Sequence, residues 1–425
     1  QKSSFFKTIY LFLLVIVTGI SAYVMFRVMR LSWVPALLLS VVALMPRFSS
    51  GTEIFGVLTF HEAIGRQAAL PLFFLGTAFL FKRMTEGKSL WPVFALFGFC
   101  LFLHPVTVML FAFISIIAVV LVRFFQQEKI MVIIREAVMS GIAFILSGAY
   151  FFVDVFSRLS RGVEGESVSS HLYTQAIMFR NAWEFQPESL LFFRHMAAVS
   201  IFFVLLIIGY YFLPKLRALR ITYPPPYGRE LMVWGLSMAV WAPALTLVLP
   251  GINLYLMEHN SAPYIFQQWS RISKFYYLGI FIALIPVVYV LWNWYLESKF
   301  RFKKTIAGIL FVGGILSSSF AFEVAQYLAG YKNFEKSYIP QALSGIPDDV
   351  TPREYREVCQ ALEKMGATPE SSIISSNFAF RYYCRADLYV TSEEGAVYQQ
   401  LKRSDVVDWY TQLLAQREAQ NEGDP

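Results

Sequence analysis

Ionisable residues at the ends of long apolar runs are the first candidates for chemistry in this chain. His61, Glu62 and Arg66 precede one apolar run by less than two helical turns, and His104-Pro105 separates two others. A carboxylate can act as a general base or hold a divalent metal ion, and a guanidinium can bind phosphate. Because an ionisable group at membrane depth costs free energy, its presence there favours a functional interpretation.

Each of these residues also has a structural interpretation. His104 can cap the helix that starts at Pro105 or satisfy a buried carbonyl, and we weigh this equally with a functional role. Glu62 and Arg66 have the spacing of a local ion pair on a helix. The chain has no Walker loop, dinucleotide glycine fingerprint, HExxH or CxxC motif. Its five His and three Cys are too few and too scattered to predict a metal site.

Further cations lie in two long polar loops, around 154–195 and 251–275. Guanidinium groups suit phosphate, and a lipid-linked phosphate or pyrophosphate would present such a group at this depth. The alternative is a solvated loop in which the cations pair with Glu164, Glu166, Glu184 and Glu188. For the set as a whole we expect at least one anion contact. The candidates in these loops are Arg158, Arg161, His171, Arg180, Arg271 and Lys274.

The elements that must position these residues are apolar runs of about 15–22 residues, long enough for a bilayer core of ~30 Å. Of the 425 residues, 56% are hydrophobic and only 15% are charged. A soluble domain of this size cannot bury so much apolar surface, so we predict an α-helical polytopic membrane protein. Ten runs begin near Thr8, Leu31, Gln67, Ser89, Val106, Ile134, Met196, Leu231, Tyr276 and Thr305.

Basic clusters occupy every second turn between these runs. Short loops rich in Lys and Arg stay cytoplasmic, so both chain ends and all the candidate residues are predicted on the outer side. The net charge of +7 then reflects topology and anionic lipid contacts, and we expect no nucleic-acid partner. The clusters are Arg27/Arg30, Lys82/Arg83/Lys88, Arg123/Lys129/Arg135, Lys215/Arg217/Arg220/Arg229 and Lys299/Arg301/Lys303/Lys304.

Three outer segments interrupt the hydrophobic pattern before the composition changes near Phe322. We expect segment 48–66 to lie flat on the membrane, and the loop near 154–195 to hold surface helices at Ser170–Ala182 and Pro187–Phe193. Thr351-Pro352 with Glu354 has the pattern of a helix start. We therefore predict a membrane domain at 1–322, a linker at 323–350, a small α/β domain at 351–416 and a disordered tail at 417–425. The α/β domain is expected to contain strands Ser371–Ser375 and Asp387–Thr391, helices Thr351–Met365 and Ser404–Gln416, and the cysteines Cys359 and Cys384, whose pairing stays open.

Several stretches resemble bacterial multi-spanning proteins related to the GT-C glycosyltransferase superfamily. They are HEAIGRQAALPLFFLGTAFLFKR, GKSLWPVFALFGFCLFLHPVTVMLFAF, QWSRISKF and the C-terminal TPESSIISSNFAFRYYCRADLYV. The shared elements are an outer Arg before a helix (Arg66), a short basic turn and a His-Pro pair (His104-Pro105). The resemblance implies a GT-C-like membrane domain in the bacterial inner (plasma) membrane, with the C-terminal α/β domain outside the cytoplasm.

That family uses a polyprenyl-phosphate sugar as donor and often an acidic residue of the first outer loop as base or metal ligand. Carried over to this chain, Glu53 or Glu62 would deprotonate the acceptor or hold a divalent ion, and His104 would orient a reacting group. His61, Arg66 and the loop cations would bind the lipid-linked phosphate.

The chain departs from the family pattern because no Asp-Asp, Asp-Glu or Glu-Asp pair occurs in an outer membrane loop. We expect at least one helix upstream of Gln1, where such a pair could lie. The alternative function is a non-catalytic membrane scaffold that holds protein partners through its outer loops and C-terminal domain.

Overall fold

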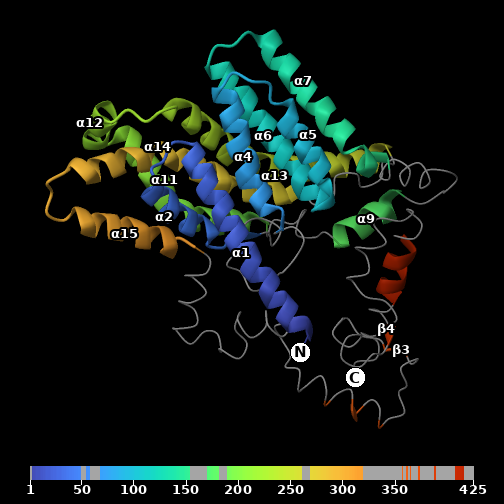
Figure 1. The fold of residues 1–425 in the computed structure, drawn as a ribbon. Helices are drawn as coiled ribbons and strands as arrows, with labels where there is room; N and C mark the ends of the chain where they lie inside the picture. Colours follow the sequence, from blue (N-terminus) through green and yellow to red (C-terminus); the bar gives the residue numbers. More distant parts are fainter. Residues whose placement is uncertain are drawn as a thin grey trace. The chain divides into compact units, whose positions relative to one another are not determined.

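The structure is a computed structural model, and Figure 1 shows its chain trace. It describes residues 2–48, 54–57, 68–153, 170–180, 189–260 and 269–318. Further on, it describes only short stretches, at 357, 360–361, 364, 372–373, 387–388 and 407–415. The chain divides into two compact units. Unit 1 comprises Gln1–Phe152, Pro187–Leu249 and Gln268–Tyr331, and unit 2 comprises Val153–Gln186, Pro250–Gln267 and Lys332–Pro425.

Helices form wherever the hydropathy pattern predicts an apolar run. In the described part of unit 1 they are α1 (Lys2–Val28), α2 (Trp33–Leu44), α4 (Leu70–Thr85), α5 (Trp91–Phe99), α6 (Pro105–Phe125), α7 (Ile130–Ser147), α11 (Ser189–Phe212), α12 (Pro214–Thr222), α13 (Gly228–Asn260), α14 (Phe275–Glu297) and α15 (Lys303–Leu316). The last residues of α13 belong to unit 2. The 3-10 helix η2 (Cys100–Phe102) extends α5, and η3 (Trp269–Lys274) leads into α14.

Within the described residues, four helices are long and apolar enough to cross a membrane: α6, α7, α13 and η3–α14. A fifth span results if α11 and α12, bent by 74° at Leu213-Pro214, count as one broken span. Pro214 lacks an amide hydrogen and its ring crowds the preceding turn, which favours a bend at this position. The chain is thus an α-helical membrane protein, and its described residues contain four to five candidate spans. Ten spans stay a prediction: among the other apolar helices, α2, α4, α5 and α15 are shorter than a bilayer core requires.

Small residues let two of the spans approach closely. Gly235 and Ala239 of α13 face Gly279 and Ala283 of α14, each pair four residues apart. A Cβ added to either glycine would lie 2.5 Å from the carbonyl oxygen of the other. The hydrophobic effect does not drive helices together inside a bilayer. Small residues instead let two backbones come close enough to associate through van der Waals contacts. The backbones of α13 and α14 are therefore in direct contact at Gly235 and Gly279.

The connection after α2 folds inward. Arg47–Phe48 (β1) pairs antiparallel with Ile54–Phe55 (β2), and Phe55 and Val57 are buried. The Phe55 ring contacts the rings of Phe74 and Phe281 at 5.9 and 6.0 Å between centroids. We had expected this segment to lie flat on the membrane. Its described residues instead pack in the helical core, where aromatic burial outweighs surface adsorption.

Unit 2 contains Val153–Gln186 and Pro250–Gln267, from the second and third outer segments, together with the C-terminal region Lys332–Pro425. The helix α9 (Ser170–Arg180) matches the surface helix expected at Ser170–Ala182, whereas the one expected at Pro187–Phe193 is the start of α11. Tyr173 and Ile177 of α9 are buried against Trp409 and Leu413 of the helix at 407–415. Two short strands, β3 (Ser372–Ile373) and β4 (Asp387–Leu388), pair in parallel at the predicted positions. The polar loop and the C-terminal region thus share a small apolar core.

Candidate functional site

The start of α6 contains the first predicted site residue. His104 is the N-cap of α6 and Pro105 is its first helical residue. The His104 Nδ1 atom accepts a hydrogen bond from the Thr107 amide at 3.3 Å, so the helix-capping interpretation is confirmed. A neutral imidazole that accepts at Nδ1 carries its proton on Nε2. The Nε2 atom of His104 is therefore a hydrogen-bond donor and not a base that abstracts a proton.

Lys274 joins the same helix start from a distant part of the chain. It ends η3, which packs against α6, and its side chain is 1% exposed. The Lys274 Nζ atom donates to the Thr107 Oγ1 atom at 3.1 Å. Thr107 thus connects His104 and Lys274, two residues that were predicted as site candidates from separate motifs. We refer to His104, Thr107, Arg271 and Lys274 as the α6–η3 cluster.

Arg271 lies on the same 3-10 helix as Lys274, three residues earlier. Side chains with this spacing eclipse one another in a 3-10 helix, so both cations leave η3 on one side. Arg271 is half-buried. The cluster therefore combines a buried ammonium group and a partly accessible guanidinium group, the second of which is suited to bidentate binding of phosphate or carboxylate.

One helix N-terminus lies in the α6–η3 cluster. Thr107 lies in the first turn of α6, whereas η3 runs directly into α14, so the helical chain begins before Lys274. A helix N-terminus carries about half a positive charge. The N-terminus of α6 adds to the charge of Lys274 and Arg271 and favours a bound anion at this position.

A second buried cation was not among the sequence candidates. Arg47 is 0% exposed and donates to two carbonyl oxygens of the preceding turn at 2.9 Å, and to the Gly314 carbonyl of α15 at 3.2 Å. Its guanidinium stacks over Phe203 and Phe281 at 5.4 and 5.0 Å from the ring centroids. Burial lowers its pKa to about 10, so it stays a cation at neutral pH. No carboxylate of the described residues pairs with it.

The sequence held one signal for Arg47. Arg47 directly follows an apolar run and falls on the predicted outer side, where the positive-inside rule disfavours Arg. Its burial could not be predicted, because the helices that enclose it come from distant parts of the chain.

The remaining predicted residues are placed elsewhere or fall outside the described residues. His171 is exposed on α9, and its Nε2 lies 3.0 Å from the Gln175 amide nitrogen. Arg180 ends α9, but its side chain is not described. Both belong to unit 2, whereas the α6–η3 cluster belongs to unit 1. Outside the described residues lie Glu53, His61, Glu62, Arg66, Arg158, Arg161, Cys359 and Cys384.

The α6–η3 cluster combines two cations with a histidine and a threonine, and no carboxylate is among its four residues. The described residues contain no group of three or more His, Cys, Asp or Glu side chains that could hold a metal ion. The carboxylates expected to act as base or to hold a divalent ion, Glu53 and Glu62, are among the residues without a described position. The geometry at hand therefore suits the binding of a phosphate-bearing group.

The chain matches no protein-family model, no curated protein and no solved structure. The function is therefore argued from the residues of the α6–η3 cluster.

Proposed function

We propose that this protein is a GT-C-like glycosyltransferase of the bacterial inner membrane. It would transfer a sugar from a polyprenyl-phosphate donor to an acceptor on the extracytoplasmic face, where its C-terminal domain also lies. The observation that supports this most strongly is the α6–η3 cluster, which joins His104 and Lys274 through Thr107. The apolar spans beside it are the surroundings that a polyprenyl chain requires.

In the proposed reaction, the bond between the anomeric carbon and the donor phosphate oxygen breaks, and the acceptor oxygen bonds to that carbon. The electron pair leaves with the phosphate, whose growing negative charge Lys274 and Arg271 stabilise at the N-terminus of α6. His104 donates from Nε2 and orients the phosphate or the acceptor. The acceptor proton passes to a carboxylate, for which Glu53 and Glu62 remain the candidates.

Binding of a polyprenyl-phosphate sugar to the purified full chain tests this proposal. We expect Lys274→Met to weaken binding about tenfold or more, since a hydrogen bond to a charged group contributes ~1.5–3 kcal/mol. The matched control is Lys129→Met, an exposed lysine of a predicted cytoplasmic turn, which should bind as the wild type does. Equal affinity of wild type and Lys274→Met, with both folded, would refute the assignment.

The absence of an acidic pair from the outer membrane loops favours the second candidate, a non-catalytic scaffold. A scaffold should leave native membranes with stoichiometric protein companions and should not bind the donor. Copurification with donor binding measured on the same sample separates the two functions.

A further inference from the structure

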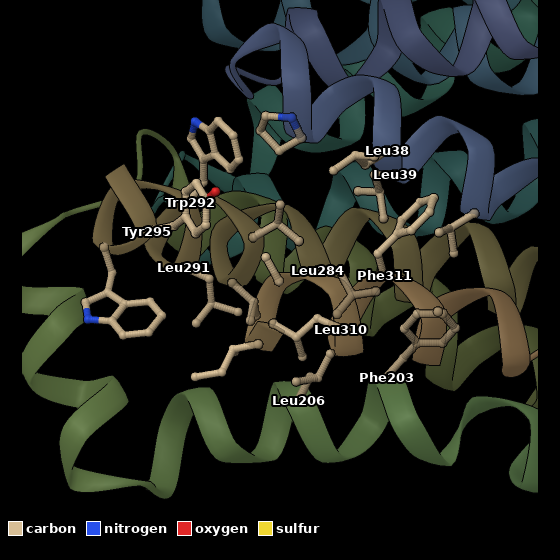
Figure 2. Close-up of a pocket in the computed structure, with 18 of the residues that line it drawn as sticks. Leu38, Leu39, Phe203, Leu206, Leu284, Leu291, Trp292, Tyr295, Leu310 and Phe311 are labelled. Carbon is tan, nitrogen blue, oxygen red and sulfur yellow. The ribbon is translucent and has the colours of Figure 1, made fainter. Parts of the chain in front are cut away.

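An apolar groove runs between four helices of unit 1, on a side of the fold that the proposed chemistry does not use. Figure 2 shows Leu38 and Leu39 of α2, Phe203 and Leu206 of α11, and residues of α14 and α15 around it. Its volume is about 150 Å³ and almost all of its lining is hydrocarbon. A cavity of that size lined by such side chains stays dry and accepts apolar ligands.

One end of the groove is cationic and aromatic. Lys303, in the first turn of α15, lines it together with Trp292, Trp294 and Tyr295 from the end of α14. The Lys303 Nζ atom lies 5.3 Å from the Tyr295 ring centroid, and the Trp292 and Tyr295 rings stack at the same centroid distance. Aromatic residues beside a lysine are typical of the headgroup level of a membrane, where a polar tip and an apolar body are both satisfied.

The opposite end of the groove lies beside the buried Arg47. It is lined by Val42, Phe203 and Gly314. Arg47 donates hydrogen bonds to the carbonyl oxygens of Val42 and Gly314, and its guanidinium stacks on the Phe203 ring. From Lys303 to Gly314 the groove follows α15 for about 16 Å, at 1.5 Å per residue. That is roughly half of the ~30 Å hydrocarbon core, the depth that one leaflet occupies.

We propose that this groove binds one acyl chain of an anionic phospholipid, with the lipid phosphate at Lys303. The length fits a chain from a single leaflet, and the charge at the open end selects an anionic headgroup. The Lys299/Arg301/Lys303/Lys304 turn is one of the clusters that the positive-inside rule assigns to the cytoplasm. The bound lipid therefore belongs to the leaflet opposite the one that would supply the sugar donor, and the site is separate from the α6–η3 cluster.

Native mass spectrometry of the purified full chain tests this with phosphatidylglycerol, with phosphatidylcholine of the same chains, and with a polyprenyl phosphate. We expect one retained phosphatidylglycerol. Ala307→Trp fills the groove and should abolish retention, whereas Ile309→Trp, on the exposed side of α15, should not. Lys303→Gln should weaken retention about fivefold, the equivalent of ~1 kcal/mol per basic residue near an anionic surface. Lys129→Gln is the matched charge control.

A photoreactive group at the end of the acyl chain gives a readout that does not depend on the folding of any variant. In wild-type protein it should label peptides of α2, α11, α14 or α15 near Val42, Phe203, Leu284 or Gly314. The proposal is overturned by labelling confined to other helices, or by equal retention of phosphatidylcholine. Unchanged retention in folded Ala307→Trp, or preferential retention of the polyprenyl phosphate, would overturn it too.

Discussion

Thr107 links the two halves of the candidate site, because its amide donates to His104 and its hydroxyl accepts from Lys274. Removing the hydroxyl takes a hydrogen-bond partner from an ammonium group that is almost fully buried. We expect Thr107→Val to lower the free energy of unfolding by about 1–3 kcal/mol. Thr107→Ser keeps the oxygen and should restore most of the loss. Equal stability of the Val and Ser variants, measured by chemical unfolding in detergent, would exclude the Thr107–Lys274 bond as a stabilising contact.

The two interpretations of His104 can be separated because a helix cap and an imidazole donor make different demands. Asn is a good N-cap but has no ring nitrogen. His104→Asn should therefore keep the stability of the wild type and lose affinity for the phosphate-bearing donor. His104→Ala should lose about 1 kcal/mol of stability as well. If His104→Asn binds the donor as the wild type does, the residue is only a cap.

Residue types and positions were predictable at this site, and contacts were not. The His-Pro pair and the cations before α14 stood out as ionisable groups next to apolar runs. Thr107 did not, because its role depends on Lys274, which lies 167 residues away. Arg47 shows the same limit, since its partner carbonyl on Gly314 is 267 residues distant. The hydropathy pattern indicates how deep in the membrane a residue lies. It does not indicate which neighbouring helix its side chain contacts.

The close packing of α13 against α14 requires positions without a side chain, at Gly235 and Gly279. Gly235→Leu would force a side chain into the backbone of α14, so we expect a loss of about 1–3 kcal/mol. Gly308 of α15 is a matched control, because a Cβ there meets nothing within 4 Å. Gly308→Ala should stabilise the protein by roughly 0.5–1 kcal/mol, since alanine is the better helix former. Thermal unfolding of both variants in detergent is the measurement, and a Gly235→Leu protein as stable as the wild type would disprove close α13–α14 packing.

Helix positions followed from hydropathy, while helix lengths did not. Each apolar run is a helix in the described part of the chain, yet α2 spans 12 residues and α15 spans 14. The runs end early where polar or ring-constrained residues intervene, as at Met45-Pro46 after α2. Arg47 lies buried directly after the shortened α2, between helices from distant parts of the chain.

At the scale of the whole molecule, the grouping of unit 2 supports the predicted sidedness. Its three segments come from separate parts of the chain, and the positive-inside pattern had assigned all three to the outer face. Segments on opposite sides of a membrane could not share the core of Tyr173, Ile177, Trp409 and Leu413. The sidedness itself stays a prediction, and it decides whether the α6–η3 cluster can meet a donor outside the cytoplasm.

Thiol labelling tests that prediction in intact cells. In a chain whose Cys100, Cys359 and Cys384 are replaced by Ser, His171→Cys places an exposed thiol on α9, and Lys88→Cys places one in the turn between α4 and α5. A membrane-impermeant reagent should label position 171 directly and position 88 only after the cells are permeabilised. Reversed labelling would put unit 2 in the cytoplasm. The outer-face transferase would then fail, and so would the cytoplasmic-leaflet origin of the groove lipid, because both depend on the same assignment of the basic turns.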